Sequence, residues 1–428
     1  APKFMTPALY EFLMHWGTHK KDEEVELHVR KTLEGMAYGG IYDQIGGGFS
    51  RYSVDPRWHI PHFEKMLYDN AQLLSLYAMG YARFGDPEFK HVVRQTVAFM
   101  IRELQHPEGG FYASLDADSM NADGKLEEGA YYSWSEQELR DVLKDDFEWV
   151  KAYYNINAFG HWEKGQYVLV RKEPDGDFAK KMEWTPGELR QNVSRIQKRL
   201  MEFRENKPRP RLDDKLITSW NGLALSGLCD ALRFCEIPEA LEHARTLASF
   251  IEKTLTTSDG GLLHSYKAGG IPVNGYLEDY ATVIQGYIKL YSVTREPLWM
   301  DRAASLMEYA LTYFSDSDKP LLYFSSSKDR ALIRRTVEVN DSVIPSSNSI
   351  MAKNLFLLGA FFSDTAYRER ATAMLGSMAA AMDRYPGQYS NWMHLALWMK
   401  APFFEVVITG PEAFEMLGRL QPRYLPNT

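Results

Sequence analysis

Long stretches of the chain repeat apolar residues at spacings of three and four, which is the pattern of amphipathic helices. Segments 126–134 and 161–172 have β character instead and predict a small excursion, while FEVVITG at 404–410 predicts a strand. The chain is therefore predicted to be mostly helical. The predicted helices cover 4–16, 22–37, 62–84, 87–105, 135–154, 185–206, 214–235, 238–255, 276–294, 297–314, 346–362 and 365–384.

A weak repeat follows every second predicted helix. The turns read GGIYDQIGGGFSRYS, GGFYASLDADS, GGLLHSYKAGG and KPLLYFSSSKD. Glycine suits the residue after a helix because it adopts positive φ, and repetition at every second helix implies stacked helical hairpins. Six hairpins predict an all-α (α/α)6 toroid with short β excursions over residues 1–400, followed by a strand-containing segment over 401–428. An open helical solenoid is the alternative, but long and short loops alternate, as expected if one end lines the mouth of a central funnel.

Composition narrows the classes of function. The chain has 428 residues and a net charge of −8 with scattered Lys and Arg, which argues against a nucleic-acid partner. It has no run of about 18 apolar residues, so no membrane span is expected. Cys229 and Cys235 are expected to be reduced core residues. The sequence opens with APKFM and no apolar signal segment, which suggests a trimmed chain, and a cytoplasmic location is expected.

Polar residues at the start of strongly apolar predicted helices are the candidates for catalytic residues. In RWHIPHFEKMLYDN, His62 and Glu64 stand at a predicted helix start, where a histidine and a carboxylate in a water-poor funnel suit proton transfer. Other acids precede or open later helices, and His264 lies on a loop before one of them. The candidate catalytic residues are His62, Glu64, Asp116, Asp118, Asp214, His264, Glu278 and Asp279.

Neighbouring polar and aromatic residues are candidate substrate contacts. Each also has a structural alternative: aspartates before a helix can cap it, acids in a first turn suit the helix dipole, and a loop histidine can simply be solvated. The candidate substrate contacts are Arg51, Tyr52, Trp58, Asp69, Lys215, Trp220, Asn221, Tyr276 and Asn348.

The sequence lacks the motifs of several well-known metal, nucleotide and hydrolase sites. Counting an EF-hand from Asp116 places Asn121 where glycine is required, although Glu127 fits the last position. There is no Gly-x-Ser-x-Gly elbow, no P-loop and no dinucleotide-binding glycine fingerprint. No metal and no cofactor are therefore expected.

Five segments resemble a known family. GGIYDQIGGGFSRYSVDPRWHIPHFEKMLYDNAQL, GGFYASLDADS, DDKLITSWNGLAL, YLEDYA and IPSSNS resemble, in this order, the hallmark segments of the thioredoxin-domain-containing family that includes the spermatogenesis-associated thioredoxin-like proteins. The resemblance implies a six-hairpin glycosidase-like toroid, distantly similar to N-acylglucosamine 2-epimerases. It implies that this chain lacks the family's thioredoxin-like domain and its cysteine pair.

Two classes of function are expected. In the first, the toroid binds a sugar or sugar derivative in an acidic, aromatic funnel. An epimerase or isomerase would use His62 and His264 as bases with Glu64 or Asp116 assisting, and a glycosidase would use two of the candidate carboxylates. In the second, the toroid is a noncatalytic scaffold for a thioredoxin-like domain, with a funnel plugged by aromatic side chains such as Tyr52, Trp58 and Trp220. The expected partners are a small-molecule carbohydrate and possibly a thioredoxin-like domain, without nucleic acid or membrane.

Overall fold

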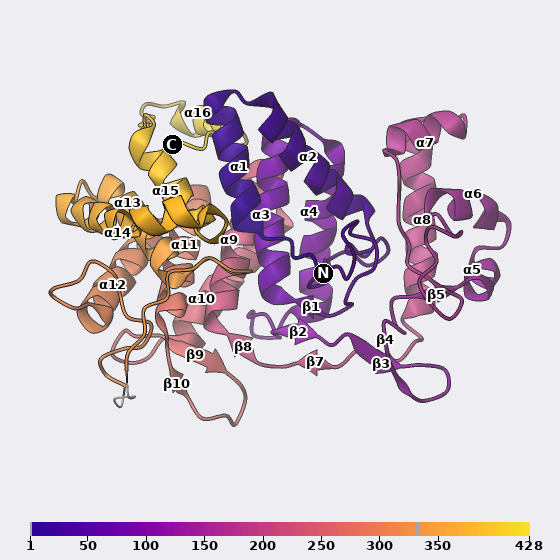
Figure 1. The fold of residues 1–428 in the computed structure, drawn as a ribbon, viewed down its shortest axis with the longest axis horizontal. Coiled ribbons are helices and arrows are strands. Elements are labelled where there is room, and N and C mark those ends of the chain that lie inside the picture. Colours follow the sequence, from indigo (N-terminus) through magenta and orange to yellow (C-terminus); the bar gives the residue numbers. More distant parts are fainter. Residues whose placement is uncertain (1, 330–333) are drawn as a thin grey trace.

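Six helices form a closed inner ring in the computed structural model, which describes residues 2–329 and 334–428 (Figure 1). Each helix contacts the next around the ring, and the last contacts the first. This closed circuit makes the chain an (α/α)6 toroid of the expected all-α class. The inner helices are α1 (Pro7–Lys20), α3 (Leu67–Phe84), α9 (Thr218–Cys235), α11 (Leu277–Thr294), α13 (Ser347–Phe361) and α15 (Ser390–Lys400).

Outer helices cover the ring. Each of the first five inner helices packs against the helix that follows it in its hairpin, and α16 follows α15. One large hydrophobic cluster fills the space between the two layers and includes both cysteines, which are free, as predicted. The outer helices are α2 (Glu23–Tyr38), α4 (Pro87–Phe99) with η1 (Met100–Leu104), α10 (Glu239–Phe250) with η3 (Ile251–Leu255), α12 (Pro297–Phe314), α14 (Thr365–Arg384) with η4 (Pro386–Gln388), and α16 (Ala413–Leu420).

Glycines allow the inner helices to approach closely. A side chain at Gly227 of α9 would meet the carbonyl oxygen of Ala71 in α3 at 2.6 Å. One at Gly222 would meet Thr282 of α11 at the same distance. Because no Cβ is present, α9 packs tightly against both neighbours.

Four helices form an excursion outside the ring (Figure 1). They enclose a separate hydrophobic cluster that includes Trp134, Phe147 and Ile196. The segments 135–154 and 185–206 are largely helical as predicted, but they do not form a ring hairpin, because their apolar faces are buried against each other. The excursion helices are α5 (Glu136–Leu143) with η2 (Lys144–Asp146), α6 (Phe147–Tyr153), α7 (Asp175–Lys181) and α8 (Pro186–Arg204).

The sixth place in the ring belongs to α15, which the periodicity did not reveal. Its sequence SNWMHLALWMK is short and apolar on several sides, so it lacks a clear helical stripe. The predicted strand at 404–410 is wrong: no strand is assigned within 401–428, all of which is described. Its backbone has no neighbouring strand to pair with, as β structure requires.

Short antiparallel strands gather at the N-terminal ends of α3, α9 and α11, at the lower edge of Figure 1. One strand pairing changes the predicted start of α3. Lys65 and Met66 pair with Leu115 and Ser114, so the helix begins at Leu67 and the preceding residues lie in a loop. The strands are β1 (Lys65–Met66), β2 (Ser114–Leu115), β3 (Asp118–Met120), β4 (Leu126–Glu128), β5 (Trp134–Ser135), β6 (Gln166–Tyr167), β7 (Leu212–Asp213), β8 (Leu216–Ile217), β9 (Leu263–Tyr266) and β10 (Val273–Asn274).

Buried side chains explain the repeated turn. The Asn221 Oδ1 accepts a hydrogen bond from the Phe111 amide at 2.8 Å, and its Nδ2 donates to the carbonyls of Phe111 and Ile217 at 3.0 and 2.9 Å. The same pattern joins Asn70 to Phe49 and Asn348 to Leu322. In α11 a tyrosine takes this role, since the Tyr280 hydroxyl accepts from the Leu262 amide at 2.9 Å. A side chain from the start of each of these inner helices thus pins the turn before it.

This pattern corrects two expected substrate contacts. Asn221 and Asn348 are fully buried, and both amide hydrogens of each are used by backbone carbonyls. Their role is to hold the ring together.

We expect Asn221→Ala to lower the free energy of unfolding by about 2–4 kcal/mol, because it leaves the buried amide and carbonyl of Phe111 without their partner. Urea unfolding followed by circular dichroism measures the effect. Asn206→Ala, at the exposed end of α8, is the matched control. An equal loss in both variants would contradict the structural role of Asn221.

No membrane crossing is visible in the described part of the chain, where none of the helices combines enough length with enough apolar character.

Candidate functional site

All six inner helices contribute to a polar cavity on the ring axis, which we call the lumen. Its volume of about 40 Å³ gives room for about three water molecules. Pro345, from the segment before α13, also lines it, and the neighbouring Val343 carbonyl accepts from Gln72 Nε2 at 3.0 Å, so this segment narrows the entrance. The polar residues that line the lumen are Glu11, Gln72, Ser75, Ser226, Gln285, Lys289, Lys353 and Asn391.

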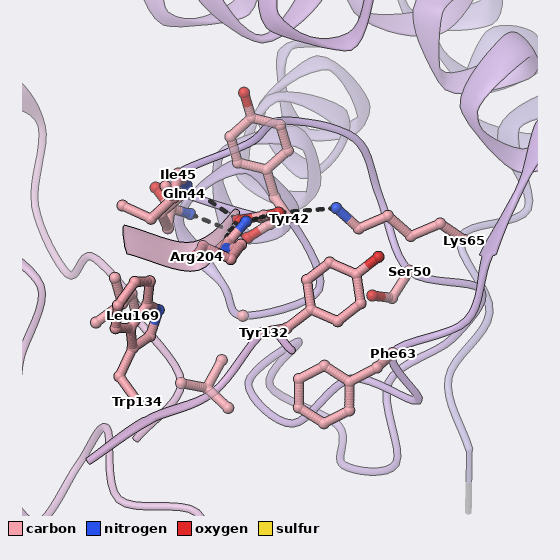
Figure 2. Close-up of a pocket in the computed structure, with 13 residues that line it drawn as sticks. Tyr42, Gln44, Ile45, Ser50, Phe63, Lys65, Tyr132, Trp134, Leu169 and Arg204 are labelled. Carbon is pink, nitrogen blue, oxygen red and sulfur yellow. Dashed lines mark hydrogen bonds and ion pairs between the residues drawn. The ribbon is translucent and has the colours of Figure 1, made fainter. Parts of the chain in front are cut away.

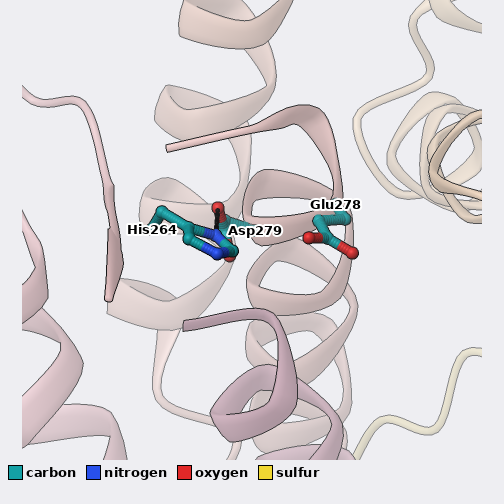
Figure 3. Close-up of side chains that lie close together, drawn as sticks. All are labelled: His264, Glu278 and Asp279. Carbon is teal, nitrogen blue, oxygen red and sulfur yellow. Dashed lines mark hydrogen bonds and ion pairs between the residues drawn. The ribbon is translucent and has the colours of Figure 1, made fainter. Parts of the chain in front are cut away.

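His264, Glu278 and Asp279 lie close together at the head of α11, the helix that also lines the lumen with Gln285 and Lys289 (Figure 3). His264 comes from β9, and the two acids open α11. The Asp279 Oδ2 lies 3.0 Å from His264 Nδ1 and accepts from the Tyr276 amide at 2.8 Å, while Oδ1 accepts from the Ser219 amide at 2.8 Å. The Asp279 carboxylate accepts the hydrogen on Nδ1. The lone pair of His264 Nε2 is therefore free to accept a proton or a hydrogen bond.

The environment raises the pKa of both Glu278 and His264. Burial raises the pKa of Glu278 to about 7, and the charge of Asp279 adds to this while His264 opposes it. Burial disfavours the charged imidazole, but the hydrogen bond and charge of Asp279 outweigh this and raise the pKa of His264. The His264 side chain is 24% exposed and Asp279 is fully buried, so only the histidine of this pair can meet a ligand.

Glu278 stands at the entrance to the lumen. Gln285 and Lys289 follow it by seven and eleven residues on α11, so the three share one helix face. The latter two line the lumen, which places Glu278 above them at the helix head.

Aromatic side chains surround the entrance. Tyr276 lies 4.8 Å from the His264 ring and stacks on Phe324 at 5.1 Å. On the neighbouring helices, Trp220 meets Tyr68 edge to face at 4.8 Å. Ser219, the residue before Trp220, donates its backbone amide to Asp279. The pair of Trp220 and Tyr68 therefore lies next to the pair of Tyr276 and Phe324, and we call these aromatic side chains together the rim.

Three further predicted residues meet at the α3 end of this rim. The Arg51 Nη1 donates to the Glu64 Oε2 at 3.1 Å, in the loop before α3. Asp69 is buried, and its Oδ2 has no hydrogen-bond partner among the described residues. Burial raises the pKa of Asp69 well above its usual range.

The structure disperses the remaining predicted side chains. His62 stacks on Tyr52 at 4.7 Å and its Nδ1 lies 2.8 Å from Glu128 Oε1, so the expected pair of His62 with His264 across the funnel is not formed. Trp58 is 4% exposed and packs against Gly35 and Gly39, which removes it from the funnel.

The predicted acids of the connecting loops form ion pairs at the surface. Asp116 pairs with Arg211 at 2.7 Å, and Asp214 pairs with Lys267 at 2.6 Å. Lys215, predicted to contact substrate, instead pairs with its neighbour Asp213 at 3.0 Å. Asp118 lies on β3 opposite Glu128. None of these residues lines the lumen.

The charged residues of the lumen escaped the sequence analysis. Lys353 is 5% exposed, and burial lowers its pKa to about 8. Burial also raises the pKa of Glu11. Their signal was a charged residue within the apolar runs NSIMAKNLF and PALYEFLM, which predicts either a buried ion pair or a site.

The acid and histidine group offers few ligands to a metal ion. One ligand atom from each of His264, Glu278 and Asp279 lies within 4.8 Å of the others. However, Asp279 already accepts three hydrogen bonds, including the one that orients His264. This leaves His264 Nε2 and Glu278, fewer than the three protein ligands of a catalytic zinc site.

A second charged cluster ties the excursion to the ring (Figure 2). Asp43, in the loop after α2, accepts from Lys65 Nζ at 2.9 Å and from both terminal nitrogens of Arg204 at 2.7 and 3.0 Å. Although burial opposes its charge, these cations hold the pKa of Asp43 well below its usual range. Arg204 ends α8, so the cluster joins the excursion to the loop before α3, beside a cavity of about 20 Å³.

Comparison with known proteins finds relatives over the whole chain. No family model matches the sequence. The chain is 31% identical to an uncharacterised protein of Caenorhabditis elegans over an alignment of 467 positions, which covers 100% of this chain and 63% of that protein. It is 30% identical to spermatogenesis-associated protein 20 of Mus musculus over an alignment of 474 positions, which covers all of this chain and 59% of that protein. The chain thus spans about three fifths of the length of the curated relatives it matches.

Solved structures with similar chain traces are more distant. Cellobiose 2-epimerase from Spirochaeta thermophila aligns with a TM-score of 0.49 and 13% identity over 86% of this chain and 73% of that chain. A family 76 glycoside hydrolase from a bovine Bacteroides thetaiotaomicron strain aligns with a TM-score of 0.47 and 11% identity over 83% of this chain and 55% of that chain. The toroid assignment rests on the closed circuit of helices in this chain itself.

Proposed function

We propose that this protein is a carbohydrate-active enzyme of the epimerase or isomerase type, which moves a proton beside a sugar carbonyl at the entrance to the lumen. The observation that carries the proposal is the juxtaposition of His264 and Glu278, with His264 oriented by the buried Asp279 and the pKa of Glu278 raised to about 7. Such groups can both take and give protons at pH 7.

The proposed reaction needs only these side chains. His264 Nε2 takes the proton from the carbon next to the carbonyl, and the electron pair of that C–H bond forms the C=C bond of an enediol. The carbonyl oxygen takes a proton from Glu278. To give the isomer, protonated His264 returns its proton to the former carbonyl carbon, while Glu278 takes the proton of the hydroxyl on the neighbouring carbon, whose oxygen becomes the new carbonyl. To give the epimer, the enediol turns so that its other face meets His264, which returns the proton to the carbon it came from, while Glu278 takes back the proton it gave. In both cases His264 and Glu278 regain their starting states.

The surroundings suit a sugar. Tyr276 and Trp220 offer apolar faces at the entrance. Glycoside hydrolysis is less favoured, because it needs a second carboxylate free to act. Asp279, the acid adjacent to Glu278, is held by three hydrogen bonds.

Incubation with free and linked sugars in D2O, followed by NMR, tests the proposal. We expect deuterium to enter the carbon beside the carbonyl of a free sugar, together with formation of an epimer or isomer. Release of reducing sugar from linked substrates would favour the glycosidase. Absence of turnover, together with no sugar-induced change in melting temperature, would favour the noncatalytic toroid that partners a thioredoxin-like domain. Fractionation tests the cytoplasmic location that belongs to this proposal.

The pH dependence of kcat/KM should be bell-shaped and narrow. The rate should fall as the pH rises through about 7, because Glu278 loses the proton it donates. It should also fall on the acid side, because His264 gains a proton and stops acting as a base. Glu278→Gln should remove the alkaline limb and lower the rate, since an amide has no such proton to lose. An unchanged profile in this variant would exclude Glu278 as the acid.

A further inference from the structure

Lys353 is a buried ammonium group without a carboxylate in contact. Its Nζ donates to Asn391 Oδ1 at 2.9 Å and lies 3.3 Å from His394 Nδ1, and both partners are neutral when they accept. It also lies 4.8 Å from the centre of the Trp398 ring. Among the described residues, no acid lies within ion-pair distance of Lys353, whereas Lys289 pairs directly with Asp230. A buried charge of this kind is stabilised by an anion.

The other charges around Lys353 leave it uncompensated. Glu11 and Asp341 act on it from a distance, and Lys289 opposes them. Asp341 accepts hydrogen bonds from Ser346, Ser349 and the Asn391 amide, which consume its oxygens. Burial raises the pKa of Glu11, while the charges of Lys353 and Lys289 lower it, and Glu11 makes no ion pair with Lys353 among the described residues. One of the three Nζ hydrogens of Lys353 is left over for a ligand in the lumen.

The lumen is the size of a carboxylate group. Its volume of about 40 Å³ holds about three waters, which is too little for a sugar ring or a phosphate. Ser226 Oγ lines it and has no hydrogen-bond partner among the described residues, although Ser226 is only 3% exposed. Gln285 adds an amide to the same space. These groups can hold the oxygens of one small anionic group.

Helix α13 relates the depth of Lys353 to the helix heads near Glu278. Glu338 accepts from the Ser347 amide at the head of α13, and its charge acts on Glu278, so this helix head lies at the entrance. Lys353 follows Ser347 by six residues, which is about 9 Å along the helix axis. A six-carbon sugar can therefore reach Lys353 with one end while the other lies at the entrance.

We infer that the substrate is a sugar acid whose carboxylate enters the lumen and pairs with Lys353, while the carbon beside its carbonyl lies between His264 and Glu278. This inference rests on the proposed function and names its substrate class. Lys353 is thus a specificity residue: it selects the charged end of the substrate and sets the depth to which the sugar enters.

Binding of matched sugars to the wild-type protein tests this inference without any substitution. D-glucuronate, D-glucuronamide and D-glucose share a ring and differ at the sixth carbon, so calorimetry at constant ionic strength isolates the charge. We expect glucuronate to bind about tenfold more tightly than the amide or glucose, the gain of one charge-assisted hydrogen bond. Galacturonate and galactose form a second matched set.

Lys353→Met should abolish the preference for the acid over its amide, and Lys198→Met, at an exposed position of α8, should preserve it. Equal binding of acid, amide and neutral sugar to the wild-type protein would overturn the inference and leave the proposed function standing. So would a preference for acids that survives in Lys353→Met. If none of these sugars binds and a wider panel shows no proton exchange, both proposals fail.

Discussion

Replacing Asp43 with asparagine is expected to lower the free energy of unfolding by about 3–5 kcal/mol. The substitution keeps the shape of the side chain but removes its charge, and Lys65 and Arg204 are then two buried cations without their shared anion. Both are 2% exposed, so water cannot replace the lost partner. Breaking a buried ion pair from one side is expensive for this reason, even where the intact pair adds little.

Urea unfolding followed by tryptophan fluorescence and circular dichroism measures this effect. Asp146→Asn is the matched control, because Asp146 also bridges two arginines, Arg195 and Arg199, but on the surface. We expect the control to lose about 1 kcal/mol or less. Because Asp43 joins the ring to the excursion, its loss should also separate their transitions. If Asp43→Asn lowered the free energy of unfolding no more than Asp146→Asn does, the cluster of Asp43, Lys65 and Arg204 would not be what joins the excursion to the ring.

The fold was largely predictable from the sequence because most inner and outer helices have a clear apolar stripe. An apolar stripe predicts that a segment is helical, but not which hydrophobic core will bury it. For this reason the helices of the excursion, 135–154 and 185–206, were predicted to belong to the ring. The repeated turn was visible, but its cause was not, since Asn221 must be seen against Phe111 before its amide is understood. Helix α15 was missed because it is short and lacks a clear apolar stripe.

The candidate site was predictable only where residues are close in sequence. Glu278 and Asp279 are adjacent, and the rotation of about 100° per residue sends one to the entrance and the other into the core. Their partner His264 is brought in by the pairing of β9 with β8, which no local pattern encodes. Lys353 and Glu11 meet only when the ring closes, so each looked like an isolated charge in an apolar helix.

His264→Gln is expected to lower kcat by about 10²–10⁴, the range for loss of a general acid or base. Glutamine can still donate to Asp279, so the loop and α11 should keep their positions, but it has no group that takes a proton at neutral pH. The melting temperature should therefore change little while the rate of deuterium exchange into the sugar falls. Rate and stability together separate a chemical role from a structural one.

Two companion variants sharpen this result. In Asp279→Asn the new amide can present a hydrogen to His264 Nδ1, which favours the imidazole tautomer with its proton on Nε2. This variant should therefore lose much of the same activity, although residue 279 does not touch the substrate.

His62→Gln should change kcat less than about twofold, because His62 contacts Tyr52 and Glu128 away from the lumen. If His62→Gln were as damaging as His264→Gln, the two-histidine arrangement predicted from the sequence would have to form on substrate binding. Full activity in His264→Gln would instead remove the pair of His264 and Glu278 from the chemistry.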